Sequence, residues 1–201
     1  MDKLSYALGM SIAHNLRESG VNSLDFESFT SGLRDLMSGG QTRLSFDEAG
    51  KILDRFFTET EARMKEEQGE MAAAFKEEGE TWLKANAAKE GVKTLASGLQ
   101  YKVIKEGNGK KPGPRDKVRC HYEGTLVNGM KFDSSYDRNE PAVFGVNQVI
   151  AGWTEALQLM TEGSVWELYI PYQLAYGEQG AQGAIPPCAA LIFKVELLEV
   201  L

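Results

Sequence analysis

Apolar residues at every fourth position predict two amphipathic helices at the start of the chain. The first stripe runs from Leu4 to Leu16 and predicts a helix over residues 2–19. A second helix is expected to begin after a cap at Asp25 and to stop at Gly39-Gly40.

A third and much longer helix is expected next. Ser45 and Glu48 have the spacing of a capping box, in which each side chain pairs with the backbone N–H of the other. Helix-forming residues then continue without a proline over residues 46–89, about 44 residues or roughly 65 Å. Apolar groups crowd only the first third. The remainder is rich in Glu and Lys, which predicts a stalk helix that crosses solvent. Gly69 and Gly79 are expected to lower the stability of this helix locally.

Two short helices and one end of a third make a small core for an independent domain, and folds of this size usually need a partner. Residues 1–57 are therefore predicted to form a homodimer with two-fold symmetry. A monomeric three-helix cap that folds back on the stalk is the alternative. Residues 58–90 are the predicted stalk helix, and residues 91–201 a separate domain.

From Gly91 onward, strand periodicity replaces helical periodicity. Five strands are expected, two of them joined by Asn128-Gly129, a pair typical of tight hairpin turns. One short helix against about five antiparallel strands predicts an α+β domain whose sheet curls around that helix. The expected strands cover residues 99–105, 116–127, 131–133, 164–170 and 190–198.

The short helix follows the segment VIAGW, residues 149–153. Trp153 is expected to open about two turns of helix, and Gly163 stands where that helix would end. A buried aromatic ring beside the unpaired N–H groups of a helix start suits an apolar ligand that carries a carbonyl. An ordinary core tryptophan is the alternative interpretation.

A long loop is expected between the last two strands, over residues 172–189. It carries Tyr176 on its outward path and Ile185 on its return, where Pro186-Pro187 stiffens the chain. The loop could therefore place a tyrosine and an isoleucine over the mouth of the short helix.

Charge and composition exclude several classes of partner. The net charge is −7, of which residues 1–90 carry −6, so the sequence offers no basic face for nucleic acid or anionic membranes. No apolar run approaches the roughly 20 residues of a membrane span. The first residues lack the pattern of a signal peptide, which predicts the cytoplasm; the periplasm or cell surface is the alternative if a signal was removed.

Metal and covalent chemistry find little support in the sequence. Only two histidines are present and no CxxC motif, so neither a metal site nor a cofactor is predicted. Cys120 and Cys188 are expected to stay reduced. Neither Ser164 nor Asp137 has an oriented base beside it, which argues against a hydrolase.

Five motifs stand in order along the second half: VRCHYEG at 118–124, GMKFDSS at 129–135, VIAGW at 149–153, LAYG at 174–177, and IPP through LIFKVEL at 185–197. Together they resemble the FKBP family of peptidyl-prolyl cis-trans isomerases. The helical front half and the stalk resemble its bacterial Mip-type branch, whose members dimerise through their N-terminal helices. Ala142 stands where many relatives have a second phenylalanine, although bacterial members often lack it, and Ala151 stands where the Mip-type branch usually has proline.

The resemblance implies a catalytic pocket and its ligands. Proline-containing peptides and unfolded proteins are the implied substrates, and macrolides such as tacrolimus the implied inhibitors. A binding module with little turnover and a dimerising scaffold are the competing functions. The residues implied to be catalytic are Tyr122, Phe132, Asp133, Trp153, Tyr176 and Phe193, and those implied to bind substrate are Arg138, Phe144, Val149, Ile150 and Ile185.

Overall fold

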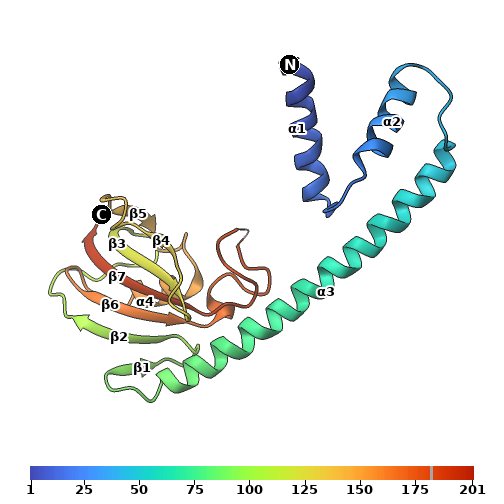
Figure 1. The fold of residues 1–201 in the computed structure, drawn as a ribbon. Coiled ribbons are helices and arrows are strands. Elements are labelled where there is room, and N and C mark those ends of the chain that lie inside the picture. The colour runs from blue at the N-terminus through green and yellow to red at the C-terminus, as the bar shows by residue number, and fades with distance from the viewer. Residues whose placement is uncertain (182) are drawn as a thin grey trace. The chain divides into compact units, whose positions relative to one another are not determined.

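The computed structural model describes residues 1–181 and 183–201 (Figure 1). The chain divides into two compact units, Met1–Glu67 and Gln68–Leu201, and one long helix runs through the boundary between them.

The first unit consists of helices at the places that the sequence predicts. Helix α1 spans Lys3–Glu18, α2 spans Phe26–Met37, and α3 begins at Phe46 and continues to Asn86. Asp25 accepts a hydrogen bond from the backbone N–H of Ser28 at 2.8 Å, as expected of the cap of α2.

The capping box before α3 is also present. The backbone N–H of Ser45 donates to Glu48 at 2.9 Å, and the N–H of Glu48 donates to the Ser45 hydroxyl at 3.2 Å. The reciprocal bonds confirm the predicted start of α3, which at 41 residues is slightly shorter than expected.

The second unit is an antiparallel sheet of seven strands rather than about five. Strands β2, β3, β4, β6 and β7 lie where strand periodicity predicts them; β1 and β5 are additional. These two have only three and four residues, too few to show an alternating pattern. The sheet order is β1-β2-β6-β7-β3-β4, and β5 pairs with β3. The strands are β1 Val92–Thr94, β2 Gln100–Lys105, β3 Lys117–Leu126, β4 Lys131–Ser134, β5 Ala142–Gly145, β6 Val165–Ile170 and β7 Leu191–Val200.

The sheet curls around one short helix, α4, which confirms the predicted α+β architecture (Figure 1). Helix α4 spans Ala151–Leu157, so it begins two residues before Trp153 and ends well before Gly163. Gly152 explains why it lies so close to the sheet: a Cβ at this position would be 2.5 Å from a methyl carbon of Ile170 in β6. Gly163, at φ +88°, instead shapes the turn into β6.

The last turns of α3 belong to the second unit and have a buried face. Leu83 packs with Tyr169 and Ala190 in a small apolar cluster. The side chain of Asn86 donates to that of Gln100 at 3.0 Å, and Gln100 donates to the backbone carbonyl of Leu83 at 2.9 Å. Both polar side chains are buried, so these bonds fix the end of α3 to β2.

In the described part of the chain, no helix combines the length and the apolar character needed to cross a membrane.

Candidate active site

A cavity of about 640 Å³ opens into the second unit, between the curled sheet, α4 and the loop of residues 172–189. It brings together every residue that the sequence predicts for the site except Arg138, which lies beside it. The lining also includes Gln148, Ala181 and Ala184, which the sequence did not single out. The predicted residues on its wall are Tyr122, Phe132, Asp133, Phe144, Val149, Ile150, Trp153, Tyr176, Ile185 and Phe193.

Trp153 forms the floor of the cavity and is only 3% exposed. Three other rings pack nearly perpendicular to it: Tyr122 at 5.5 Å, Phe144 at 5.6 Å and Phe193 at 5.3 Å between ring centroids, each at an interplanar angle between 77° and 86°. Edge-to-face packing of this kind holds the indole in a fixed orientation. The result is a rigid aromatic floor.

One wall depends on a glycine in β3. Phe132 and Phe193 pack edge to face at 5.5 Å, and Gly124 lies against both rings. A Cβ at Gly124 would come within 2.6 Å of Phe132 and 2.7 Å of Phe193, closer than real Cβ atoms come to their neighbours. The absence of a side chain at this strand position therefore allows the two rings to meet.

The rim of the cavity is polar. The Tyr122 hydroxyl donates a hydrogen bond to Asp133 and accepts one from the Arg138 guanidinium at 2.9 Å. Arg138 also forms an ion pair with Asp133. Three side chains from β3, β4 and the following turn thus form a closed network that fixes the Tyr122 ring beside Trp153.

This network shifts two pKa values. Partial burial acts to raise the pKa of Asp133, but hydrogen bonds from Tyr122 and Arg138 outweigh it and lower that pKa below its usual value. Burial, together with the hydrogen bond to Asp133, raises the pKa of Tyr122 despite the opposing effect of Arg138. Asp133 is therefore a carboxylate at neutral pH and Tyr122 a neutral phenol.

A flat pH profile is expected from this arrangement. Asp133 has a lowered pKa, so its contribution to stability is complete above the unfolded value of about 4 and is lost as the pH falls through the lowered value. Tyr122 titrates above its usual value of about 10. We expect kcat/KM for a proline-containing peptide to vary by less than about twofold between pH 5 and 9. A bell-shaped profile within that range would show that a proton is transferred in the reaction.

The described parts of the loop, residues 172–181 and 183–189, close one side of the cavity. The loop begins with a 3-10 turn, Tyr172–Leu174, and its two arms are joined where the N–H of Cys188 donates to the carbonyl of Gly177 at 3.0 Å. Tyr176 is 42% exposed, whereas Ile185 is 7% exposed. The loop thus presents a partly exposed tyrosine and a buried apolar side chain to the same cavity.

Residues suited to covalent or metal chemistry do not gather at this site. Burial raises the pKa of the Cys120 thiol to about 12, so it stays protonated. His121 points to Ser135, with 2.9 Å between Nδ1 and the hydroxyl oxygen, and stacks on Tyr136. Among the described residues, no three His, Cys, Asp or Glu side chains are close enough together to hold a metal ion.

Comparison with known proteins places this geometry in a family. Residues 108–198 match the family model of FKBP-type peptidyl-prolyl cis-trans isomerases, and residues 1–103 match the model of the domain amino terminal to such isomerases. The chain belongs to the FKBP-type peptidyl-prolyl cis-trans isomerases. It is therefore an enzyme that interconverts the cis and trans forms of peptide bonds preceding proline.

Relatives of this FKBP-type isomerase resemble it over nearly its whole length. The FKBP-type 22 kDa peptidyl-prolyl cis-trans isomerase of Escherichia coli (strain K12) is 45% identical over 98% of this chain and 94% of the relative. The outer membrane protein MIP of Legionella longbeachae is 42% identical over 99% of this chain and 85% of the relative. The crystal structure of FkpA from Escherichia coli matches with a TM-score of 0.75 at 35% identity, covering 98% of this chain and 92% of that one. The helical first half and the isomerase domain are thus both similar to those of known proteins.

Proposed function

We propose that the aromatic cavity is the active site and that it catalyses rotation about the bond preceding proline without forming a covalent intermediate. The observation that supports this most directly is the floor of the cavity, where Trp153 packs nearly perpendicular to three other aromatic rings. A proline ring is apolar, compact and flat enough to rest on an indole of this kind.

The reaction needs no acid, base or nucleophile. Uncatalysed rotation about a bond preceding proline has a barrier of about 18–20 kcal/mol and takes about 10–100 s. Rotation breaks the amide resonance, so the twisted amide is less polar than either planar form. A pocket that removes water from the amide therefore stabilises the twisted state relative to both planar states. Each factor of 10³ in rate requires about 4 kcal/mol, which desolvation, shape and one or two hydrogen bonds can supply.

Two donors are positioned to hold the carbonyl groups of a substrate. The N–H of Ile150 makes no hydrogen bond within residues 1–181 and 183–201, and Ile150 lines the cavity. Tyr176, which carries the second donor, lines the same cavity and is partly exposed. Asp133 and Arg138 act through Tyr122, whose ring they fix at the edge of the floor.

Refolding of a protein limited by proline isomerisation tests the proposed activity. At a protein-to-substrate ratio of roughly one to a hundred, the slow refolding phase should accelerate, and tacrolimus should compete for the cavity. If tacrolimus binds and refolding does not accelerate, the second function is favoured: a protein- or macrolide-binding module with little turnover.

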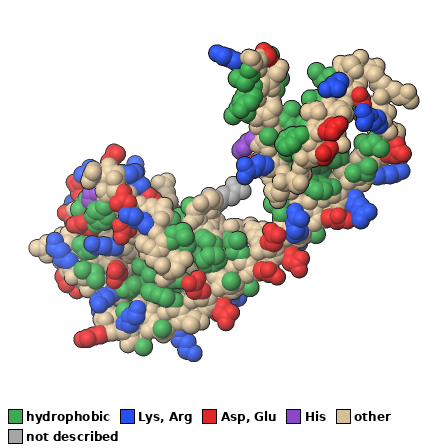
Figure 2. Space-filling model, viewed as in Figure 1, with side chains coloured by type: hydrophobic (Ala, Val, Ile, Leu, Met, Phe, Trp, Pro, Cys, Tyr) green, Lys and Arg blue, Asp and Glu red, His purple; other side chains and the backbone are tan. Residues whose placement is uncertain are grey.

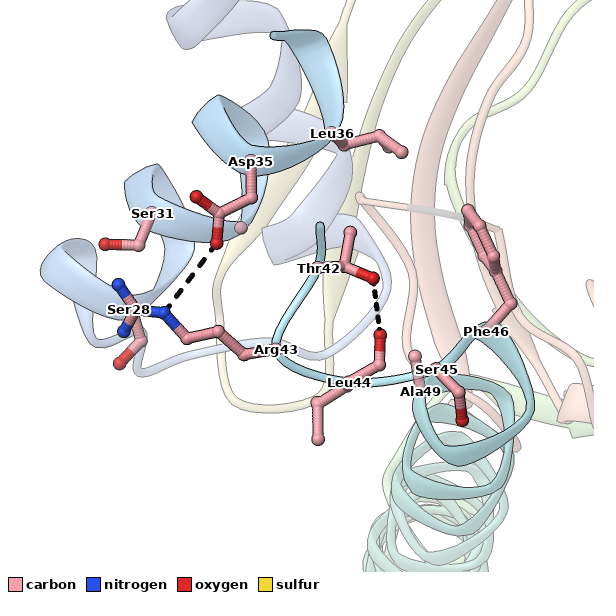
Figure 3. Close-up of a pocket in the computed structure, with 11 residues that line it drawn as sticks. Ser28, Ser31, Asp35, Leu36, Thr42, Arg43, Leu44, Ser45, Phe46 and Ala49 are labelled. Atoms are coloured by element: carbon pink, nitrogen blue, oxygen red, sulfur yellow. Dashed lines mark hydrogen bonds and ion pairs between the residues drawn. The ribbon is translucent and has the colours of Figure 1, made fainter. Parts of the chain in front are cut away.

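The first unit supports a proposal of dimerisation. Helices α1 and α2, both described in full, contain no buried side chain. Large apolar residues stay exposed along them, and Figure 2 shows these side chains in green on both helices. A hollow of about 410 Å³ lies between α2 and the start of α3, with Leu36 and Phe46 on facing sides (Figure 3). We infer that a second copy covers these surfaces, as predicted for residues 1–57.

Charge on the α1 stripe is expected to separate the dimer. Leu8→Glu/Ile12→Glu places two carboxylates on residues that are 55% and 37% exposed within one copy, so the first unit can keep its own fold. Light scattering after gel filtration should report a monomer. Lys65→Glu changes the net charge by the same amount on the exposed part of α3 and should stay dimeric. A dimer that persists in the double variant would contradict the interface.

A dimer would also carry two isomerase domains, which raises the effective affinity for extended, unfolded chains. The monomeric variant should keep its activity on short peptides and lose most of its ability to prevent aggregation of an unfolded protein.

We infer a location outside the cytoplasm, the alternative that the sequence left open, because the relative from Legionella longbeachae is named an outer membrane protein. Fractionation of the native cell, with the chain detected by antibody, tests this.

A further inference from the structure

We propose that Gly79 of α3 is a positioning residue for the isomerase reaction. Because it has no side chain, Ala190 can pack directly against the helix, and this contact fixes the loop that carries Tyr176 and Ile185. The proposal rests on the active site proposed above. It gives the end of α3 a second role besides linking the two units. It also implies that the isomerase domain begins within α3, before residue 90.

One face of α3 is buried over its last three turns. Phe75 is half-buried against the core of the second unit, and Gly79, Leu83 and Asn86 follow on the same side at helical spacing, all buried. Their neighbours Glu77, Glu78, Glu80 and Lys84 are exposed. The buried bonds of Asn86 and Gln100 hold this face in a fixed register against β2.

The backbone of Gly79 lies directly against Ala190. A Cβ built at this position would lie 2.9 Å from the Cβ of Ala190 and 3.4 Å from its backbone nitrogen. Glycine is one of the poorest helix formers, so its presence in the middle of a helix calls for a packing reason. Gly69, ten residues earlier in the same helix, shows the contrast: a Cβ there would meet nothing within 4 Å.

Both ends of the loop of residues 172–189 rest on α3. Ala190 follows the loop directly and precedes β7. At the other end, the ammonium of Lys76 lies 5.9 Å from the centre of the Tyr172 ring. Lys76 and Gly79 are three residues apart, so a single turn of helix contacts both ends.

A displacement at Ala190 would reach the cavity because the returning arm of the loop is stiff. Pro186 and Pro187 restrict the backbone, and Cys188 has a φ of +57°, unusual for a residue other than glycine. The N–H of Cys188 is also bonded to the carbonyl of Gly177, next to Tyr176. The arm should therefore move as one piece and carry Ile185 and Tyr176 with it.

The test compares alanine at two glycines of one helix in the full-length protein. Gly79→Ala should lower kcat/KM for a proline-containing peptide by about fivefold, because small misplacements of substrate-positioning groups have large effects. Gly69→Ala should leave it unchanged. In an Ala190→Gly background, which removes the colliding methyl group, the Gly79→Ala change should cost less than about 1.5-fold. Amide signals of Tyr176 and Ile185 should shift in Gly79→Ala, and that of Trp153 should not.

Several results would overturn the proposal. The first is an equal kcat/KM for Gly79→Ala and Gly69→Ala. The second is a loss of kcat/KM in Gly79→Ala that Ala190→Gly does not restore. The third is that the amide signals of Tyr176 and Ile185 do not shift in Gly79→Ala. If the wild-type protein has no isomerase activity, the proposed function fails, and the amide signals still decide whether Gly79 positions the loop. If Gly79→Ala does not fold, the double variant Gly79→Ala/Ala190→Gly, which lacks the colliding methyl group, should fold and keep kcat/KM within about 1.5-fold of the wild-type value. A double variant that also fails to fold would count against the proposal.

Discussion

Replacing Trp153 with alanine is expected to lower kcat/KM by a factor of roughly 60. A proline ring that enters the cavity above the indole removes roughly 100 Å² of its own apolar surface from water, which at about 25 cal/mol per Å² corresponds to about 2.5 kcal/mol of binding in the transition state. The variant should also lose about 3–5 kcal/mol of stability, because a buried indole is removed. Activity is best measured at about 10 °C, where the variant has more chance to stay folded and uncatalysed isomerisation takes minutes.

Trp166 offers a matched control. It is 6% exposed, belongs to the same core and stacks on Tyr101 at 4.4 Å, but it does not line the cavity. Trp166→Ala should therefore lose a similar amount of stability and keep kcat/KM within about threefold of the wild-type value. Comparable loss of activity in both variants would mean that the Trp153 effect comes from general destabilisation, and the assignment of the floor would be wrong.

Much of the fold follows from patterns that act over short distances. Helical stripes and caps locate α1, α2 and the start of α3, because a cap needs only residues three positions apart. Alternation locates the longer strands, and Asn128-Gly129 marks the turn between β3 and β4, where Gly129 has a φ of +87°. Strands β1 and β5 were not predicted from the sequence, because they are strands through pairing with their neighbours and not through an alternating pattern of their own.

The site was predictable through family resemblance more than through spacing. Its residues come from β3, β4, β5, the segment leading into α4, α4 itself, the loop before β7, and β7, and no local pattern brings these segments together. Gln148, Ala181 and Ala184 were missed because small or polar residues in loops carry no signal of their own. The resemblance supplied Arg138, and the structure shows why it matters: it lies outside the cavity and bonds to Tyr122.

Gly79 shows a limit of sequence reasoning. A glycine within a run of Glu and Lys indicates a weak point in a helix, and by that criterion Gly69 and Gly79 are equivalent. Only tertiary packing distinguishes them, since Ala190 occupies the space beside Gly79 alone. For the same reason the Glu- and Lys-rich pattern could not reveal that the last turns of α3 pack on the sheet, because Gly79 and Asn86 are not apolar.

Gly124→Ala should be the most damaging small change in the active site. The added methyl group would overlap the rings of Phe132 and Phe193, and Phe193 cannot move away easily because it also packs against Trp153. Overpacking of this kind costs about 1–3 kcal/mol of stability. We expect the displaced rings to narrow the cavity and lower kcat/KM by roughly 10- to 100-fold, in line with the effect of misplaced substrate contacts.

Gly163→Ala separates this effect from ordinary strain. Gly163 has a φ of +88°, so alanine there should cost about 1–2 kcal/mol, yet its Cβ would meet only Gly107, at 3.8 Å. Both variants should therefore unfold at a lower temperature, and only Gly124→Ala should lose activity. The double variant Gly124→Ala/Phe132→Leu, with a smaller side chain opposite the new methyl group, should recover part of the lost stability. If Gly124→Ala keeps wild-type kcat/KM, the two phenylalanine rings are not a wall that the substrate contacts.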